Sequence, residues 1–257
     1  MKVQLLPSSI ENGVASQRQR LTTFLLDDLV AIDAGSLPFG CSDAQRQSVR
    51  DIVLSHTHLD HIAGLPIFID DLFATLESPV RVHASRGMID VLEKSVFNWD
   101  VYPRFSDLSN DFGSVLEYVP FEFDTPFSIE HFDITAIEVD HHGPSAGFLI
   151  RDGMDAFGFT GDTSATEKFW TTLNDEPRVA AVFVECSFPN RLQALADRSN
   201  HLTPERLGVE IGKLHVPTER IFVTNIKASY RDEVISEIAK LRIPNVEIMT
   251  IGEVVEL

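Results

Sequence analysis

Positive charge is scarce in this sequence. Lys and Arg together number 21 against 39 Asp and Glu, which gives a formal net charge of −18 over 257 residues. Nucleic acids are held mainly by Lys and Arg that displace condensed counterions, so a surface this acidic repels a polyanion except at a locally positive site. Anionic membrane surfaces are disfavoured for the same reason. The composition therefore argues against a nucleic-acid polymer or a membrane as the partner.

Cysteines and long apolar runs are also few. Cys41 and Cys186 are the only cysteines and form no CxxC pair, which fits a reducing compartment. No stretch approaches the 18 or so uninterrupted apolar residues of a membrane span. The opening MKVQLLPSSI has a short apolar run broken by Pro7, too brief for the core of a signal peptide. We therefore expect a cytoplasmic protein that does not enter the membrane.

No low-complexity segment, internal repeat or Pro/Gly/Ser-rich linker divides the chain, so we expect a single domain over residues 1–257. Two strand-rich halves, each followed by helices, predict an α/β fold of two sheets packed face to face with helices outside. Strands are expected at 2–6, 21–26, 29–33, 49–55, 80–85, 132–140, 147–152, 155–162, 179–185 and 221–225, and helices at 62–76, 88–97, 167–173, 204–215 and 230–241.

The most informative feature is a histidine cluster directly after an apolar strand. The segment LSHTHLDHIAGLP places His56, His58, Asp60 and His61 within six residues. At a strand end, a His-x-His pair can turn both imidazoles to one face because side chains alternate with period two. Imidazole nitrogen and carboxylate oxygen together suit zinc and similar divalent ions. A solvated polar turn is the alternative, and it would have to gather three of the nine histidines by chance.

This cluster resembles the HxHxDH motif of the metallo-β-lactamase superfamily, and further matches follow in order along nearly the whole chain. Asp33 in AIDAG resembles the family aspartate that orients the HxHxDH loop. His141 in VDHHGPSAGF and Asp162 in FTGDT resemble its third-motif histidine and bridging aspartate. The flanking HLDHIAGL and HLTP are most similar to class-II-like cyclic-nucleotide phosphodiesterases, close to the tRNase Z-type enzymes. The resemblance implies a four-layer αββα sandwich of two mixed sheets with outer helices.

The resemblance further implies two divalent metal ions, with Zn expected and Mn or Fe as alternatives. His141 matches the family spacing to Pro144 and Gly147, and His142 stays an alternative ligand. By family order, one ion would bind His56, His58, His141 and Asp162, and the other Asp60, His61, Asp162 and one more residue.

The last of these ligands departs from the family pattern. The related phosphodiesterases have a histidine in a TH(I/L)KxxY segment, whereas this chain has VTNIKASY, with Asn225 at that position. An amide oxygen is a poorer zinc ligand than imidazole, so a site that uses Asn225 should be weaker or shifted toward a harder ion such as manganese. Alternatively, Asn225 is an ordinary strand-end residue and water completes the second site.

A proton donor for the leaving group is also expected. Glu185 in FVECSF and His201 in SNHLTPERL resemble the Glu and His pair of tRNase Z-like enzymes, in which the His donates the proton and the Glu holds its tautomer. Asp60 is a candidate general base. The alternatives are a surface charge at Glu185 and a helix-entry residue at His201.

These features predict a metal-dependent hydrolase of a small phosphodiester, such as a 3′,5′-cyclic nucleotide. Related enzymes are often dimers, so a homodimer is a further expectation. Three other functions stay open: a tRNase Z-like ribonuclease, a thioester or lactone hydrolase, and a metal-binding protein with a lapsed active site. Against the ribonuclease, the chain has no insertion rich in Lys, Arg and Gly that could hold RNA.

Overall fold

The computed structural model describes residues 1–257, which divide into two compact units. The first unit contains residues 1–17, 21–122 and 251–256, and the second contains 18–20, 123–250 and 257. The first unit therefore includes both the first and the last strand of the chain. The single domain expected from the sequence stays a prediction.

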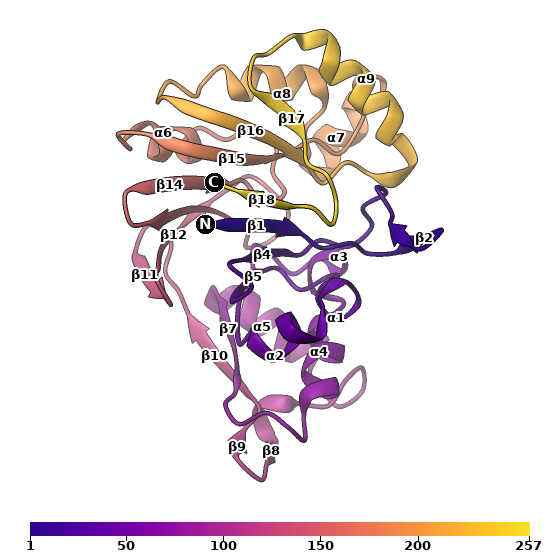
Figure 1. Ribbon diagram of the computed structural model, residues 1–257, viewed down its shortest axis with the longest axis vertical. Helices are drawn as coiled ribbons and strands as arrows, with labels where there is room; N and C mark the ends of the chain where they lie inside the picture. Colours follow the sequence, from indigo (N-terminus) through magenta and orange to yellow (C-terminus); the bar gives the residue numbers. More distant parts are fainter. The chain divides into compact units, whose positions relative to one another are not determined.

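A seven-stranded mixed sheet forms the centre of the first unit (Figure 1). Four of its strands pair in parallel, and the remaining pairs are antiparallel. The parallel strands come first in the order β10 (Leu116–Pro120), β7 (Val80–Ala84), β6 (Asp51–Val53), β5 (Val30–Ile32), β4 (Phe24–Leu26), β1 (Lys2–Leu5) and β18 (Val254–Glu256). Two short hairpins complete the strands of this unit: β2 (Ile10–Glu11) with β3 (Val14–Ala15), and β8 (Ser109–Asn110) with β9 (Gly113–Ser114).

The helices of the first unit are short. The expected helix over 62–76 is wrong in its extent, because the chain forms two helices there, α3 (Leu59–Ile62) and α4 (Leu65–Leu72). Gly64 lies between them, and a Cβ at Gly64 would lie 2.4 Å from the carbonyl oxygen of Ala34, so the backbone packs too closely for a side chain. The remaining helices are α1 (Leu37–Gly40), α2 (Asp43–Ser48), α5 (Arg86–Ser95) and the 3₁₀ turn η1 (Phe105–Asp107).

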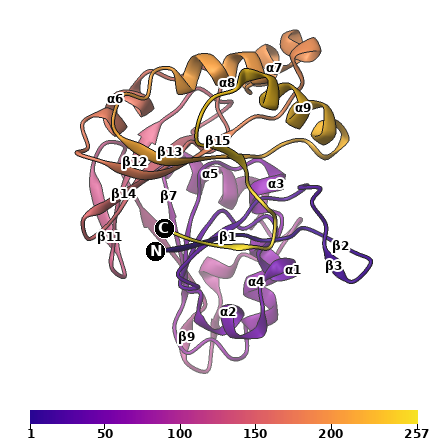
Figure 2. The same cartoon turned by 45° about the horizontal axis from the view of Figure 1, so that its top comes forward.

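The second unit is built on another seven-stranded mixed sheet (Figure 2). Its first three strand pairs are antiparallel and its last three are parallel. The order is β11 (Pro126–Ile129), β12 (Phe132–Glu138), β13 (Ala146–Asp152), β14 (Asp155–Phe159), β15 (Val179–Glu185), β16 (Thr218–Thr224) and β17 (Val246–Ile248). All seven residues of β15 are buried, as expected for a central parallel strand.

Three helices pack on one face of this sheet: α6 (Lys168–Asn174), α8 (Pro204–Ile211) and α9 (Arg231–Leu241) (Figures 1 and 2). Their apolar side chains, among them Trp170, Leu207 and Val234, form one buried cluster with β15 and β16. The expected helix over 204–215 ends earlier, at Ile211 before Gly212. The sequence reasoning did not predict α7 (Gln193–Ser199). The remaining 3₁₀ turns are η2 (Asn190–Leu192) and η3 (Ala228–Tyr230).

The expected α/β fold with two mixed sheets and helices is confirmed. The stacking of these elements into four layers stays a prediction. None of the helices combines the length and the apolar character that a membrane span would need.

A buried ion network supports the parallel strands of the first sheet. Asp51 is 2% exposed and accepts hydrogen bonds from Arg81 Nε (2.7 Å) and His83 Nε2 (2.8 Å) on the neighbouring strand β7. Burial alone would raise the pKa of Asp51, but the hydrogen bonds from His83 and Arg81 lower it below its ordinary value. Because the folded pKa lies below the unfolded one, this contribution to stability is present above pH about 4 and is lost as the pH falls through the folded pKa.

We predict that Asp51→Asn lowers the free energy of unfolding by about 2–3 kcal/mol. The NH₂ group of the asparagine would face the buried N–H donors that now bond the carboxylate, and two donors cannot form a hydrogen bond. Urea unfolding at pH 7 measures this loss. Asp90→Asn, on the exposed side of α5, is the matched control and should change stability by less than about 0.5 kcal/mol. Equal effects of the two substitutions would contradict the prediction.

Candidate metal centre

The histidine cluster lies at the ends of parallel strands, as the sequence predicts. β6 ends at Val53 and the chain continues into His56 and His58, and α3 then carries Asp60 and His61. The ring centroid of His56 lies 4.7 Å from that of His58 and 4.1 Å from that of His61. His56 and His61 are each 1% exposed. The loop therefore gathers three imidazoles, two of them deeply buried.

Asp33 fixes the conformation of this loop. It follows β5 in a left-handed conformation, and its carboxylate accepts from the Ser55 backbone N–H (2.8 Å), the Ser55 hydroxyl (2.7 Å) and His61 Nδ1 (2.6 Å). The expected orienting role of Asp33 therefore has a direct structural basis. Gly35, two residues after Asp33, allows a close approach, since a Cβ there would lie 2.0 Å from the carbonyl oxygen of Asp60.

These hydrogen bonds also set the tautomers of two imidazoles. An ionised carboxylate only accepts, so His61 Nδ1 must carry the proton that faces Asp33. The Ser55 hydroxyl donates to Asp33 as well and thus accepts from His56 Nδ1, at 2.9 Å. In both neutral rings the lone pair then lies on Nε2, the form in which histidine binds a metal ion.

In the second unit, His141 lies in the turn after β12. It is 8% exposed, and its Nδ1 donates to the carbonyl oxygen of Asn200 at 2.9 Å, which again leaves the lone pair of the neutral ring on Nε2. The neighbouring His142 is exposed and donates from Nε2 to the carbonyl oxygen of Arg198 at 2.9 Å. The hydrogen bonding of the two side chains thus favours His141 over His142 as the ligand.

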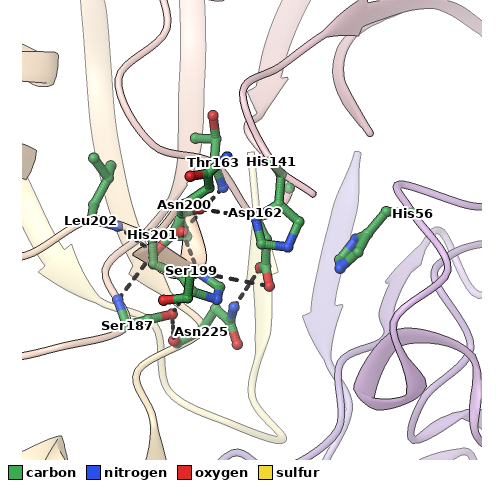
Figure 3. A network of polar contacts seen from close by, with 12 residues as sticks. His56, His141, Asp162, Thr163, Ser187, Ser199, Asn200, His201, Leu202 and Asn225 are labelled. Atoms are coloured by element: carbon green, nitrogen blue, oxygen red, sulfur yellow. Dashed lines mark hydrogen bonds and ion pairs between the residues drawn. The ribbon is translucent and has the colours of Figure 1, made fainter. Parts of the chain in front are cut away.

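Asp162 lies beside His141 and His201 in this unit. It follows β14 and is 3% exposed, and the potential ligand atoms of these three residues all lie within 4.8 Å of one another. The carboxylate oxygen of Asp162 and the imidazole nitrogen of His141 suit a first-row divalent ion. Figure 3 shows Asp162 close to His201 and Asn225.

Glu185 and His201 form a buried pair, as the sequence reasoning anticipated. Glu185 ends β15 and is 1% exposed, and its Oε1 lies 2.7 Å from His201 Nδ1. The backbone N–H groups of Thr163, Ser187 and Leu202 also donate to the Glu185 carboxylate, at 3.1, 3.0 and 3.3 Å. This arrangement orients the imidazole and places Nε2 on the side away from Glu185.

The charges of this pair depend on each other. Burial raises the pKa of Glu185, and the neighbouring His201 opposes that rise. Burial alone would lower the pKa of His201, but the carboxylate of Glu185 and its hydrogen bond raise it above the ordinary histidine value. His201 therefore holds its proton more tightly than an isolated histidine.

Asn225 follows β16 and is 7% exposed. Its side-chain Nδ2 donates a short hydrogen bond to Asp162 Oδ1. Its role as a metal ligand stays a prediction, as do the roles of the other site residues.

A pocket of about 210 Å³ lies beside the Glu185–His201 pair and is lined by His201, Asn200, Ser164 and Arg206, among others. Arg206 on α8 is exposed and makes no hydrogen bond or ion pair. The sequence-based predictions include neither Asn200, whose carbonyl orients His141, nor Arg206, which lines the pocket. A backbone carbonyl leaves no residue signature, but an arginine five residues after His201 was visible in HLTPER.

The comparisons with known proteins agree with this description. A family model described as the beta-lactamase superfamily domain matches residues 26–217, so the chain belongs to this superfamily. It is 29% identical over 188 residues to a probable 3′,5′-cyclic-nucleotide phosphodiesterase of Yersinia pestis, which covers 66% of this chain and 52% of that protein. It is 26% identical over 212 residues to the 3′,5′-cyclic-nucleotide phosphodiesterase of Aliivibrio fischeri, which covers 73% of this chain and 62% of that protein.

The chain thus spans between about half and two thirds of the length of these curated relatives. Among solved structures, unliganded yeast PDE1 superposes with a TM-score of 0.78 at 17% identity, covering 100% of this chain and 99% of that one. This likeness shows the shared fold. The predicted resemblance to the cyclic-nucleotide phosphodiesterase branch is confirmed.

Proposed function

We propose that the protein is a metal-dependent hydrolase of a small phosphodiester such as a 3′,5′-cyclic nucleotide. The observation that carries this proposal is the buried Glu185–His201 pair next to the donors His141 and Asp162. A pair of this kind can supply a proton, and the neighbouring donors can hold a divalent ion. The superfamily membership and the curated relatives named 3′,5′-cyclic-nucleotide phosphodiesterase support the same reaction.

The donor chemistry fits two divalent ions, with Zn expected and Mn or Fe as alternatives. His56, His61 and His141 each present Nε2 as the lone-pair nitrogen of the neutral ring. Bound ions of this type lower the pKa of a coordinated water to about 7 and stabilise the charge that develops during ester hydrolysis. From the superfamily pattern, we assign His56, His58, His141 and Asp162 to one ion, and Asp60, His61 and Asp162 to the other.

The protein side chains then perform the proton transfers. Hydroxide attacks phosphorus, the bond from phosphorus to the leaving oxygen breaks, and His201 Nε2 gives its proton to that oxygen. Glu185 holds Nδ1–H throughout and stabilises the charged ring before the transfer. Asp60 is the candidate base that takes the proton of the attacking water.

A small substrate suits the charge distribution better than a polymer. The net charge of −18 repels a long polyanion. In the pocket beside His201, the Asp140 carboxylate accepts from Ser164 Oγ at 2.6 Å, and Asp197 accepts from Gln193 Nε2 at 2.6 Å. Arg206 lines this pocket together with the protonated His201, and we propose that Arg206 contacts the anionic substrate.

We predict that Arg206→Ala raises KM for a cyclic nucleotide about tenfold and leaves kcat nearly unchanged, because it removes one exposed charged contact. Steady-state kinetics of the metal-loaded protein measure this split. Arg86→Ala removes the same charge from an exposed position on α5 of the first unit and is the matched control. If both substitutions change KM equally, a general effect of net charge explains the result and the proposed contact is contradicted.

A substrate panel tests the proposed function. The purified protein, loaded in turn with Zn, Mn and Fe, is offered 3′,5′-cyclic nucleotides, bis(p-nitrophenyl) phosphate, a precursor tRNA, a thioester and a lactone. We expect hydrolysis of the small phosphodiesters, lost on chelation. Cleavage of the tRNA alone would favour the ribonuclease, and cleavage of the thioester or lactone alone would favour that hydrolase. Metal binding without any turnover would favour a lapsed site. A cytoplasmic location and a homodimer stay predictions.

A further inference from the structure

The backbone of Asn225 is fixed on both sides. Its N–H donates to Gln19 Oε1 at 3.1 Å, and its carbonyl oxygen accepts from the Ser187 hydroxyl at 3.0 Å. Its φ of 51° lies in the left-handed region, which asparagine tolerates better than most residues. These two backbone hydrogen bonds therefore fix the direction in which the Asn225 side chain points.

The side chain contacts Asp162 with its amide nitrogen. Nδ2 of Asn225 donates to Oδ1 of Asp162, and the two residues are 7% and 3% exposed. An ionised carboxylate can only accept, so the NH₂ end of the carboxamide must face Asp162, and the amide oxygen would be repelled there. A hydrogen bond to a charged acceptor is stronger than one between neutral groups, and burial strengthens it further.

Both carboxylate oxygens of Asp162 lie near polar side chains. Oδ1 accepts from Asn225, and Oδ2 lies 4.0 Å from Nδ1 of His201, which Glu185 holds in turn. Figure 3 shows Asn225 and His201 both beside the Asp162 carboxylate. With one oxygen engaged by an amide donor, the plane of the carboxylate cannot rotate without losing this bond.

We propose that Asn225 is a positioning residue that orients the Asp162 carboxylate for metal binding by donating to Oδ1, and that Asn225 is not itself a metal ligand. The inference rests on the proposed function to the extent that Asp162 is a ligand. In this proposal the amide nitrogen of Asn225 orients Asp162, whereas a histidine at this position in the related phosphodiesterases would bind the metal itself.

A double-mutant cycle on metal affinity tests the proposal. Zn affinity is measured by competition with a chromophoric chelator for the wild type, Asn225→Ala, Asp162→Ala and the double variant. If Asn225 acts only through Asp162, its removal weakens binding about 10–100-fold in the wild type and less than about twofold in the Asp162→Ala background. An equal loss in both backgrounds would make Asn225 an independent ligand, and no loss in the wild type would remove the positioning role.

Asn174→Ala is the matched control, because the side chain of Asn174 also makes hydrogen bonds, donating to the Lys213 carbonyl oxygen and accepting from the Val216 N–H, but lies outside the cluster of metal donors. Metal affinity should be unchanged in this variant. Thermal unfolding of each chelator-treated variant shows whether it is folded.

A spectroscopic measurement covers the case in which Asp162→Ala binds no metal at all. The side-chain NH₂ signal of Asn225, assigned by its absence in Asn225→Ala, should exchange slowly with water in both the metal-free and the metal-loaded wild type. Rapid exchange in the metal-loaded protein would overturn the proposal. If the wild type binds metal but cleaves no phosphodiester, the proposed function fails while these measurements still decide the role of Asn225.

Discussion

Replacing His201 by alanine is expected to lower kcat/KM for a 3′,5′-cyclic nucleotide by about 10²–10⁴-fold, the range typical of a lost general acid. A sugar alkoxide is a poor leaving group, so its departure depends on a proton from the imidazole. Steady-state kinetics of the metal-loaded variant measure this loss. His215→Ala, at an exposed loop position, is the matched control and should retain the wild-type rate.

Comparing substrates with different leaving groups distinguishes a catalytic acid from a residue that only supports the fold. Nitrophenolate leaves without protonation, so the His201→Ala variant should hydrolyse bis(p-nitrophenyl) phosphate at a rate much closer to the wild type. An equal loss on both substrates would contradict the acid role of His201. Glu185→Gln should reproduce the pattern in weaker form, because glutamine keeps the shape of the side chain that holds Nδ1 but removes its charge.

Replacing Asp162 by alanine is expected to lower kcat/KM by about 10³-fold or more, because several kcal/mol of charge stabilisation depend on the bound ions. Bound metal, measured by elemental analysis of the same sample, should fall below the wild-type content. Asp175→Ala, at the exposed C-terminal end of α6, is the control and should keep both metal and activity.

A variant Asp162→Ala with full activity would remove this residue from the site. Full metal content with lost activity would instead assign Asp162 a role in orienting the substrate or the attacking water. The two readouts together therefore distinguish binding from positioning.

The parts of the site that could be predicted from the sequence are those that follow directly from strand ends. A buried run followed by polar residues marks the end of a parallel strand, which is why His56 after β6 and Glu185 at the end of β15 were placed correctly. The pairing of Glu185 with His201 came from family order, and the structure shows the two side chains 2.7 Å apart.

The remaining features depend on contacts that the sequence does not encode locally. The Gly64 backbone between α3 and α4 packs closely against Ala34, which is thirty residues away, whereas the start of α4 has a local signal in Pro66. The orientation of His141 depends on the carbonyl of Asn200, and any residue could supply a carbonyl. Asn225 looked like a weak ligand in the sequence, and only its contact with Asp162 showed the amide nitrogen as a donor.

One measurement tests the central proposal most directly. Phosphorus NMR of a 3′,5′-cyclic nucleotide incubated with the metal-free protein is followed while Zn or Mn is added stepwise. We predict that a nucleoside monophosphate signal appears, that its rate of formation rises in proportion to bound metal, and that Asp162→Ala abolishes it. A cyclic nucleotide that stays intact at every metal concentration, with metal bound to the wild-type protein, would contradict the account.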